Sequence, residues 1–163
     1  MNGSCSIRDV GMGDACALAS LHEKSFFDHW STETFQALLT RPYVKAYGGT
    51  VGTGFDLQGF VLIQIIADEA EILTFCVAPD VRRRRMGGAL LSVAERGAAL
   101  LGVSRVFLEV GEENKAARGL YDQQGYVVVG RRSAYYRSPG QQQAGTDALV
   151  MRKALPERSP SGN

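Results

Sequence analysis

The order of three segments near the middle of the chain constrains the fold most strongly. An apolar strand is predicted over 71–77, a helix over 86–101 and a second apolar strand over 103–110. A helix between two strands of one sheet is the usual connection of a parallel pair, because parallel strands need a long crossover. The sequence therefore predicts a parallel pair near the centre of a sheet.

The remaining segments predict a mixed sheet with helices packed on it. Further strands are expected over 6–10, 43–47, 58–67, 126–129 and 148–152, and further helices begin at Asp14, after Ser31 and at Asn114. The glycine-rich stretch 48–54 and the turn at 68–69 are expected as short connections between antiparallel strands. The expected fold class is α/β, with a mostly antiparallel sheet.

The length and charge of the chain limit its organisation and its partners. The 163 residues are enough for one domain, expected over 1–155, and a polar tail is expected over 156–163. The 18 basic and 17 acidic residues give a net charge of +1, so neither nucleic acid nor a membrane surface is indicated as a partner. The longest apolar run, 60–67, still contains Gln64, which favours a cytoplasmic protein.

Cysteine and histidine spacing indicates neither a disulfide framework nor a metal site. Cys5, Cys16 and Cys76 are odd in number and form no C-x-x-C pair. His22 and His29 have no metal-ligand spacing to each other or to a carboxylate cluster. We therefore expect reduced thiols and no bound metal.

Four consecutive arginines stand between the strand at 71–77 and the helix that begins near Met86. The run reads Arg82-Arg83-Arg84-Arg85-Met86-Gly87-Gly88. Cations are electrostatically unfavourable at a helix N-terminus, which carries partial positive charge. They are explained if a polyanion binds there to the side chains and to the N–H groups of the first helical turn. The alternatives are a solvated loop and a nucleic-acid patch.

A second pattern lies in the following helix. The residues Asn114, Ala117 and Tyr121 recur at spacings of three and four, so they share one face of the helix. Asn114 suits the N-cap of this helix, and the small Ala117 permits close approach of a ligand. The structural alternative for Tyr121 is a half-buried aromatic of the core.

A carboxylate ends the second apolar strand. Glu109 lies toward the carboxyl end of 103–110, where open α/β sheets usually bind ligands. A carboxylate at this position suits a proton acceptor that acts directly or through one water. Alternatively it pairs with Arg105 or Arg131, and Glu112 or Glu113 in the following loop accepts the proton.

Together the two patterns resemble the GCN5-related N-acetyltransferase (GNAT) family. Residues 77–87 follow the family pattern V-x-P-x-x-[QR]-x-x-G-x-[GA], except that Arg85 stands at the first glycine position. Residues 114–126 match N-x-x-A-x-x-L-Y-x-x-x-G-[FY] at every position. The resemblance covers nearly the whole chain. It implies transfer of acetyl from acetyl-CoA to an amine, and a central parallel strand pair splayed around acetyl-CoA with helices on both faces.

The resemblance also assigns roles to individual residues. The cofactor-binding set it implies is Phe75, Cys76, Val77, Arg82, Arg83, Arg84, Arg85, Met86, Gly87, Gly88 and Asn114. In it, the backbone of 75–77 pairs with the pantetheine amides and the arginine run holds the pyrophosphate. Arg85 supplies the N–H of the replaced glycine only if its side chain turns outward. Tyr121 becomes the general acid that protonates the departing thiolate, and Glu109 the proton acceptor.

Within the family the chain most resembles the RimI type, which acetylates the N-terminal alanine of a small-subunit ribosomal protein. The matches are 26–31, Leu108-Glu109-Val110 before Asn114, and Arg131-Arg132 followed by Tyr135-Tyr136. They place Trp30, Tyr135 and Tyr136 as aromatic walls of a groove for a peptide N-terminus. The alternatives are a small-molecule amine acceptor and a non-catalytic module that binds acyl-CoA or nucleic acid. The oligomeric state is left open, with a monomer favoured.

Overall fold

The protein contains one seven-stranded sheet with the strand order β1-β2-β3-β4-β5-β7-β6. The computed structural model describes residues 4–136 and 146–157, and only the backbone of 134–136 and of Thr146. The strands are β1 (Cys5–Asp9), β2 (Val44–Val51), β3 (Gly59–Ile66), β4 (Glu69–Val77), β5 (Arg105–Gly111), β6 (Val127–Tyr136) and β7 (Thr146–Ala154). Every neighbouring pair is antiparallel except β4 and β5. The predicted mixed sheet with one central parallel pair is confirmed.

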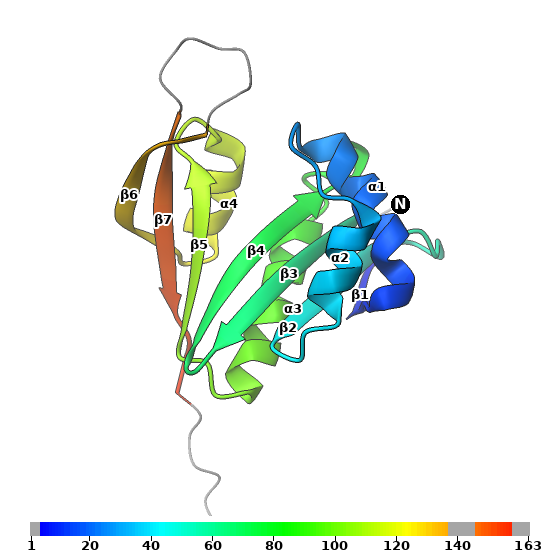
Figure 1. Ribbon diagram of the computed structural model, residues 1–163, viewed down its shortest axis with the longest axis horizontal. Helices are drawn as coiled ribbons and strands as arrows, with labels where there is room; N and C mark the ends of the chain where they lie inside the picture. The colour runs from blue at the N-terminus through cyan, green and yellow to red at the C-terminus, as the bar shows by residue number, and fades with distance from the viewer. Residues whose placement is uncertain (1–3, 137–145, 158–163) are drawn as a thin grey trace, which may run out of the picture.

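Helices cover both faces of the sheet (Figure 1). The α-helices are α1 (Ala15–Ser25), α2 (Thr32–Leu39), α3 (Met86–Leu100) and α4 (Lys115–Gln123), and two short 3-10 turns are η1 (Met12–Asp14) and η2 (Pro79–Val81). Helices α1 and α2 lie on one face, and α3 and α4 lie on the other. Two of the predicted helix starts are confirmed by capping: Ser31 accepts a hydrogen bond from Thr34 N–H, and Asn114 accepts one from Ala117 N–H.

The parallel strands β4 and β5 are paired only at their beginnings. The partners are Glu69 with Arg105, Ala70 with Val106 and Glu71 with Phe107. Beyond them β4 stays paired with β3 and β5 with β7, so the two strands separate toward their carboxyl ends (Figure 1). This confirms the predicted splay, which opens the middle of the sheet on its carboxyl-terminal side.

A β-bulge in β4 explains where the separation begins. Leu62 of β3 pairs with Thr74, but the next residue, Ile63, pairs with Ile72, so Leu73 is an extra residue in β4. A bulge bends its strand and increases the local twist. Because Leu73 comes two residues after the last residue paired with β5, the bulge turns the end of β4 away from that strand.

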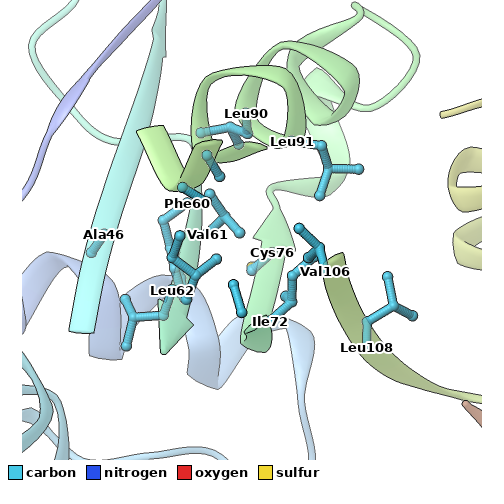
Figure 2. Close-up of a cluster of buried hydrophobic side chains, with 14 of the residues drawn as sticks. Ala46, Phe60, Val61, Leu62, Ile72, Cys76, Leu90, Leu91, Val106 and Leu108 are labelled. Atoms are coloured by element: carbon cyan, nitrogen blue, oxygen red, sulfur yellow. The ribbon is translucent and has the colours of Figure 1, made fainter. Parts of the chain in front are cut away.

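The core is centred on β3, which is buried on both faces. Its residues Phe60, Val61, Leu62 and Ile63 are at most 1% exposed. Figure 2 shows Phe60, Val61 and Leu62 below Leu90 of α3, with Ile72 and Cys76 of β4 beside them. A strand buried on both faces reads as a continuous apolar run rather than an alternating one, as 60–63 does.

The prediction that 48–54 is a connection was wrong over its first half. Strand β2 runs through Val51, and Gly49 pairs with Gly59 of β3. An added Cβ would lie 3.2 Å from the sulfur of Met86 at Gly49 and 2.7 Å from it at Gly59. The two glycines therefore form a depression that receives Met86, the first residue of α3. These positions require glycine because α3 packs closely against the two strands, and not because the chain turns there.

Two other predicted segments differ in extent. The strand predicted over 126–129 continues to Tyr136, and the last strand covers Thr146–Ala154 instead of 148–152. Each is lengthened because β6 and β7 pair with each other along most of their length. Most of the predicted tail at 156–163 lies outside the described residues.

Candidate active site

The arginine loop has an unusual backbone conformation. Arg83 and Arg85 have φ angles of 65° and 64°, in the left-handed region that favours glycine. Arg85 is the N-cap of α3, so the strained residue directly precedes the first turn of the helix. This explains why a glycine is the usual residue at this position: the loop requires a positive φ there. Arg85 adopts the required conformation at a cost of about 1 kcal/mol.

Three arginines of this loop have no acidic partner. Within 4–136 and 146–157, the side chains of Arg83, Arg84 and Arg85 make no hydrogen bond or ion pair, whereas Arg82 donates from Nε to the carbonyl of Val77 at 3.1 Å. Unpaired cations beside the N–H groups of a helix N-terminus form an anion site. The loop is therefore suited to a pyrophosphate.

Glycines in the first turn of α3 allow α4 to approach. A Cβ at Gly87 would lie 2.9 Å from a methyl carbon of Leu120 and 3.3 Å from the ring of Phe75. One at Gly88 would lie 3.0 Å from the side-chain nitrogen of Gln124. The two glycines thus bring the α3 N-terminus, the end of β4 and one face of α4 together, in addition to leaving backbone N–H groups accessible.

Peptide groups at the end of β4 point toward the splay. Ala78 N–H donates to the carbonyl of Gln58 at 2.8 Å, which fixes the direction of β4 relative to β3. Since successive peptide groups of a strand point to opposite edges, those of Phe75 and Val77 point away from β3. The carbonyl of Val77 accepts its hydrogen bond from Arg82 on that side. This edge is suited to pair with the amides of an extended ligand.

Tyr121 lies where α4 faces the end of β4. Its side chain is 6% exposed, and its ring centroid is 6.1 Å from Phe75 and 5.8 Å from Tyr126. The structure thus brings Tyr121 close to Phe75 at the end of β4. Asn114 caps α4 through its Oδ1, 3.2 Å from Ala117 N–H.

Glu109 forms an ion pair that the sequence did not indicate. Its carboxylate lies 2.8 Å from a guanidinium nitrogen of Arg132 on β6, and its side chain is 20% exposed. The two partners considered from sequence are engaged elsewhere. Arg105 pairs with Asp68 and Glu69, and Arg131 pairs with Glu112 and Asp147.

Glu109 and Tyr121 reach the splay from opposite faces of the sheet. On β4, Thr74 and Cys76 contact α1, whereas Phe75 contacts Tyr121 of α4. On β5, Val106 lies with Leu91 of α3 around a narrow gap in the core. Alternation along β5 then places Glu109 on the other face, which carries α1 and α2. Glu112 and Glu113 follow the end of β5, and Glu113 is exposed. Of these three carboxylates, only Glu109 is placed on the α1 and α2 face by the alternation of a strand.

A buried histidine organises the α1 side of the splay. His22 is 3% exposed; its Nδ1 accepts a hydrogen bond from Trp30 N–H at 3.0 Å, and its Nε2 donates to Thr74 Oγ1 at 3.2 Å. Burial, and to a smaller degree the charge of His29, lowers its pKa from 6.5 to about 4. His22 is therefore neutral at physiological pH and has a structural role.

Trp30 packs against this histidine and is half-buried. Its ring centroid is 5.1 Å from His22 and 5.6 Å from Phe35. Two aromatics of the α1–α2 connection are more exposed than Trp30: Phe27 is 83% exposed and Phe26 is 39% exposed. The backbones of Tyr135 and Tyr136 lie at the end of β6, and their side chains are outside the described residues.

Two residues of the predicted cofactor set present only their backbone. Met86 is 1% exposed and packs on Gly49 and Gly59. Cys76 is 3% exposed, its sulfur lies 2.9 Å from Ser25 Oγ, and burial raises the pKa of its thiol. A buried thiol with a raised pKa is a poor nucleophile. The site therefore offers no activated cysteine at this position.

Two classes of site have no basis in the part of the chain that the structure describes. No three histidine, cysteine or carboxylate side chains there are grouped to hold a metal ion. No helix among those residues is long and apolar enough to cross a membrane. Sequence analysis assigned no role to Phe27, which is exposed after α1, or to Arg132, the ion-pair partner of Glu109. Exposure of an aromatic and pairing across three strands both depend on tertiary structure.

The splayed strand pair and the cationic helix N-terminus define a class of protein, an acyltransferase that holds a nucleotide-linked thioester between separating strands. The model of the acetyltransferase (GNAT) family matches residues 16–126. The chain belongs to this family, and it is an N-acetyltransferase that uses acetyl-CoA.

Individual relatives agree with this assignment. The ribosomal protein bS18-alanine N-acetyltransferase of Salmonella typhimurium is 34% identical over 143 residues, which cover 88% of this chain and 91% of the relative. The crystal structure of the ribosomal-protein-S18-alanine N-acetyltransferase from Escherichia coli has a TM-score of 0.84 at 24% identity, covering 98% of this chain and 99% of that chain. Arabidopsis thaliana NAA60 in complex with acetyl-CoA has a TM-score of 0.81 at 20% identity, with coverage of 93% and 99%.

Proposed function

We propose that this enzyme acetylates the α-amino group at a protein N-terminus, and that its acceptor is the N-terminal alanine of a small-subunit ribosomal protein in the cytoplasm. The relative from Salmonella typhimurium is named for that acceptor and matches nearly the full length of this chain. The observation that carries the proposal is the position of Glu109, a largely buried carboxylate at the splay on the face opposite the arginine loop. An ammonium group that enters from that face meets a negative charge.

The cofactor set divides into backbone and side-chain contributions. Arg83, Arg84 and Arg85, with the N–H groups of the first turn of α3, hold the pyrophosphate. The peptide groups of Phe75 and Val77 pair with the pantetheine amides. Acetyl-CoA supplies the acetyl group as a thioester, which an amine attacks directly, so no covalent enzyme intermediate is needed.

Glu109 acts on the amine, and Tyr121 acts on the leaving sulfur. A peptide α-amino group has a pKa of about 7.7–8.0 and is mostly protonated at neutral pH, so Glu109 accepts its proton directly or through one water. The bond between carbonyl carbon and sulfur breaks as the bond to nitrogen forms. The hydroxyl of Tyr121 donates a proton to the departing thiolate on the α4 side.

The acceptor is tested by mass spectrometry of a matched set of amines. The set contains peptides with the bS18 N-terminal sequence, the same peptide with its first residue changed, an Nα-blocked lysine peptide and a polyamine. We expect acetylation of the alanine N-terminus at a rate at least ten times that of the blocked peptide and the polyamine. A faster reaction of the polyamine than of every peptide would reject the proposal in favour of a small-molecule acceptor.

The two acid–base roles are tested with isosteric variants. Tyr121→Phe should lower kcat by about 10²-fold and leave the affinity for acetyl-CoA unchanged, because it removes only a proton donor. Glu109→Gln should be impaired at pH 7 and recover as pH rises through the pKa of the amine. Glu112→Gln, on the opposite face, is the control. Equal impairment of the two glutamine variants would contradict the assignment of Glu109.

A further inference from the structure

We propose that Arg132 is a positioning residue for the reaction: its guanidinium on β6 holds the carboxylate of Glu109 on β5 in place at the splay. The inference rests on the role of Glu109 in the proposed function and adds the residue through which that role is maintained. Arg132 is not in contact with the reacting atoms in this assignment. It acts only by fixing the group that is.

Glu109 needs such support because of where β5 leaves β4. The last residue of β5 paired with β4 is Phe107, so Glu109 has no neighbouring strand on that side. Its ion pair with Arg132 is short, 2.8 Å, and its side chain is only 20% exposed, whereas that of Arg132 is 54% exposed. An ion pair to a largely buried carboxylate is screened less by water and salt than a pair between two exposed groups.

The strand register leaves a path for the guanidinium. Arg132 pairs with Ala148 of β7, and Ala148 pairs with Gly111 of β5, so this row contains one long side chain and two very small residues. The neighbouring row on the same face contains Glu109, Val150 and Gly130. Arg132 therefore crosses β7 diagonally past Ala148 and reaches Glu109.

The adjacent arginine provides a matched control from the same strand. Arg131 is 53% exposed, and alternation places it on the opposite face of β6. It pairs with Glu112 at 2.6 Å and with Asp147 at 3.3 Å, and it therefore also links β6 to the rest of the sheet. The two arginines differ in the face that they occupy and in the carboxylate that they hold.

The test compares Arg132→Ala, Arg132→Lys and Arg131→Ala in the full-length protein. Kinetics are measured with the amine of the panel that the wild-type enzyme acetylates fastest. If that amine is not the alanine N-terminus, the proposed acceptor is wrong, but the role of Arg132 can still be tested with it. We expect Arg132→Ala to lower kcat about 10-fold while the affinity for acetyl-CoA changes less than 2-fold. Arg132→Lys should recover part of the loss, and Arg131→Ala should retain wild-type kcat.

A double-mutant cycle separates positioning from general destabilisation. If Arg132 acts through Glu109, then Arg132→Ala has little further effect in a Glu109→Gln background. Crystal structures of the wild type and of Arg132→Ala give a second reading, in which the carboxylate of Glu109 moves in the variant. Multiplicative losses in the cycle, equal losses for the two arginine variants, or an unmoved carboxylate would each overturn the proposal.

Discussion

The two sides of the splay solve the same problem, holding charged groups at an opening in the sheet, in opposite ways. On the β4 side the scaffold is apolar, with β3 buried on both faces, and Arg83, Arg84 and Arg85 have no acidic partners among the described residues. On the β5 side, Arg131 and Arg132 of the edge strand β6 pair with the carboxylates of Glu112, Asp147 and Glu109.

The difference corresponds to what each side has to hold. Unpaired cations can bind an external anion directly, because no internal carboxylate has to be displaced first. Paired cations instead fix a side chain of the enzyme itself, such as Glu109. Four substitutions test this contrast between packing on one side and ion pairs on the other, in order of decreasing effect.

The largest expected effect comes from the packed side. Leu62→Ala removes a side chain of β3 that is 0% exposed, and it should lower the free energy of unfolding by about 2–5 kcal/mol because the surrounding core cannot collapse onto the gap. Val128→Ala on β6, where the side chain is 51% exposed, should change it by less than about 0.5 kcal/mol. Urea unfolding of both variants gives the comparison. Similar decreases in the free energy of unfolding would show that β3 and β6 depend equally on side-chain packing.

The second effect tests the link between α3, which packs on the β4 side of the splay, and β7 on the β5 side. Glu95 of α3 accepts hydrogen bonds from Lys153 Nζ at 2.6 Å and from Tyr126 OH at 3.0 Å, and its side chain is 11% exposed. Glu95→Ala leaves both donors without their acceptor and should cost about 2–3 kcal/mol in urea unfolding. Glu95→Gln keeps an acceptor and should cost less than half as much. Equal stability of the two variants would mean that the hydrogen bonds from Tyr126 and Lys153 to Glu95 do not hold α3 against β7.

The contrast between the two sides of the splay also explains which features could be predicted from the sequence. The parallel pair, the arginine loop and the α4 motif were predictable because each depends on residues close together in the chain. The pair of Glu109 and Arg132 was not, since it spans three strands and depends on the register of β7 between them. Gly48 and Gly49 suggested a turn because their reason for being glycine, contact with Leu57 and Met86, is visible only in three dimensions.

The third effect is a pH dependence on the α1 side. The pKa of His22 is lowered from 6.5 to about 4 in the folded protein, mainly by burial, so the unfolded chain binds a proton there at a higher pH than the folded one does. This contribution to stability is complete above the unfolded pKa and decreases as pH falls from about 6.5 to 4. Between pH 7 and pH 5 the free energy of unfolding therefore decreases by about 2 kcal/mol through His22.

The variant His22→Asn isolates that contribution. Asparagine retains an acceptor for Trp30 N–H but does not titrate, so its urea midpoint should fall less than that of the wild type between pH 7 and pH 5. His29→Asn is the control, because that side chain is exposed and should keep nearly the full pH dependence. Parallel pH profiles for His22→Asn and the wild type would show that His22 is protonated equally easily in the folded and unfolded chains.

The smallest expected effect is a gain in stability at the cofactor loop. Arg85→Gly removes a side chain from a residue with a φ angle of 64°, and the relief should raise the free energy of unfolding by about 0.5–1 kcal/mol without ligand. The same change removes an unpaired cation, so acetyl-CoA should bind several-fold more weakly in calorimetry.

Arg84→Ala is the matched control, because it removes a cation from a residue without a positive φ angle. It should weaken binding without any gain in stability. A loss of stability in Arg85→Gly would mean that Arg85 makes a favourable internal interaction, and that the β4 side also relies on its charges for folding.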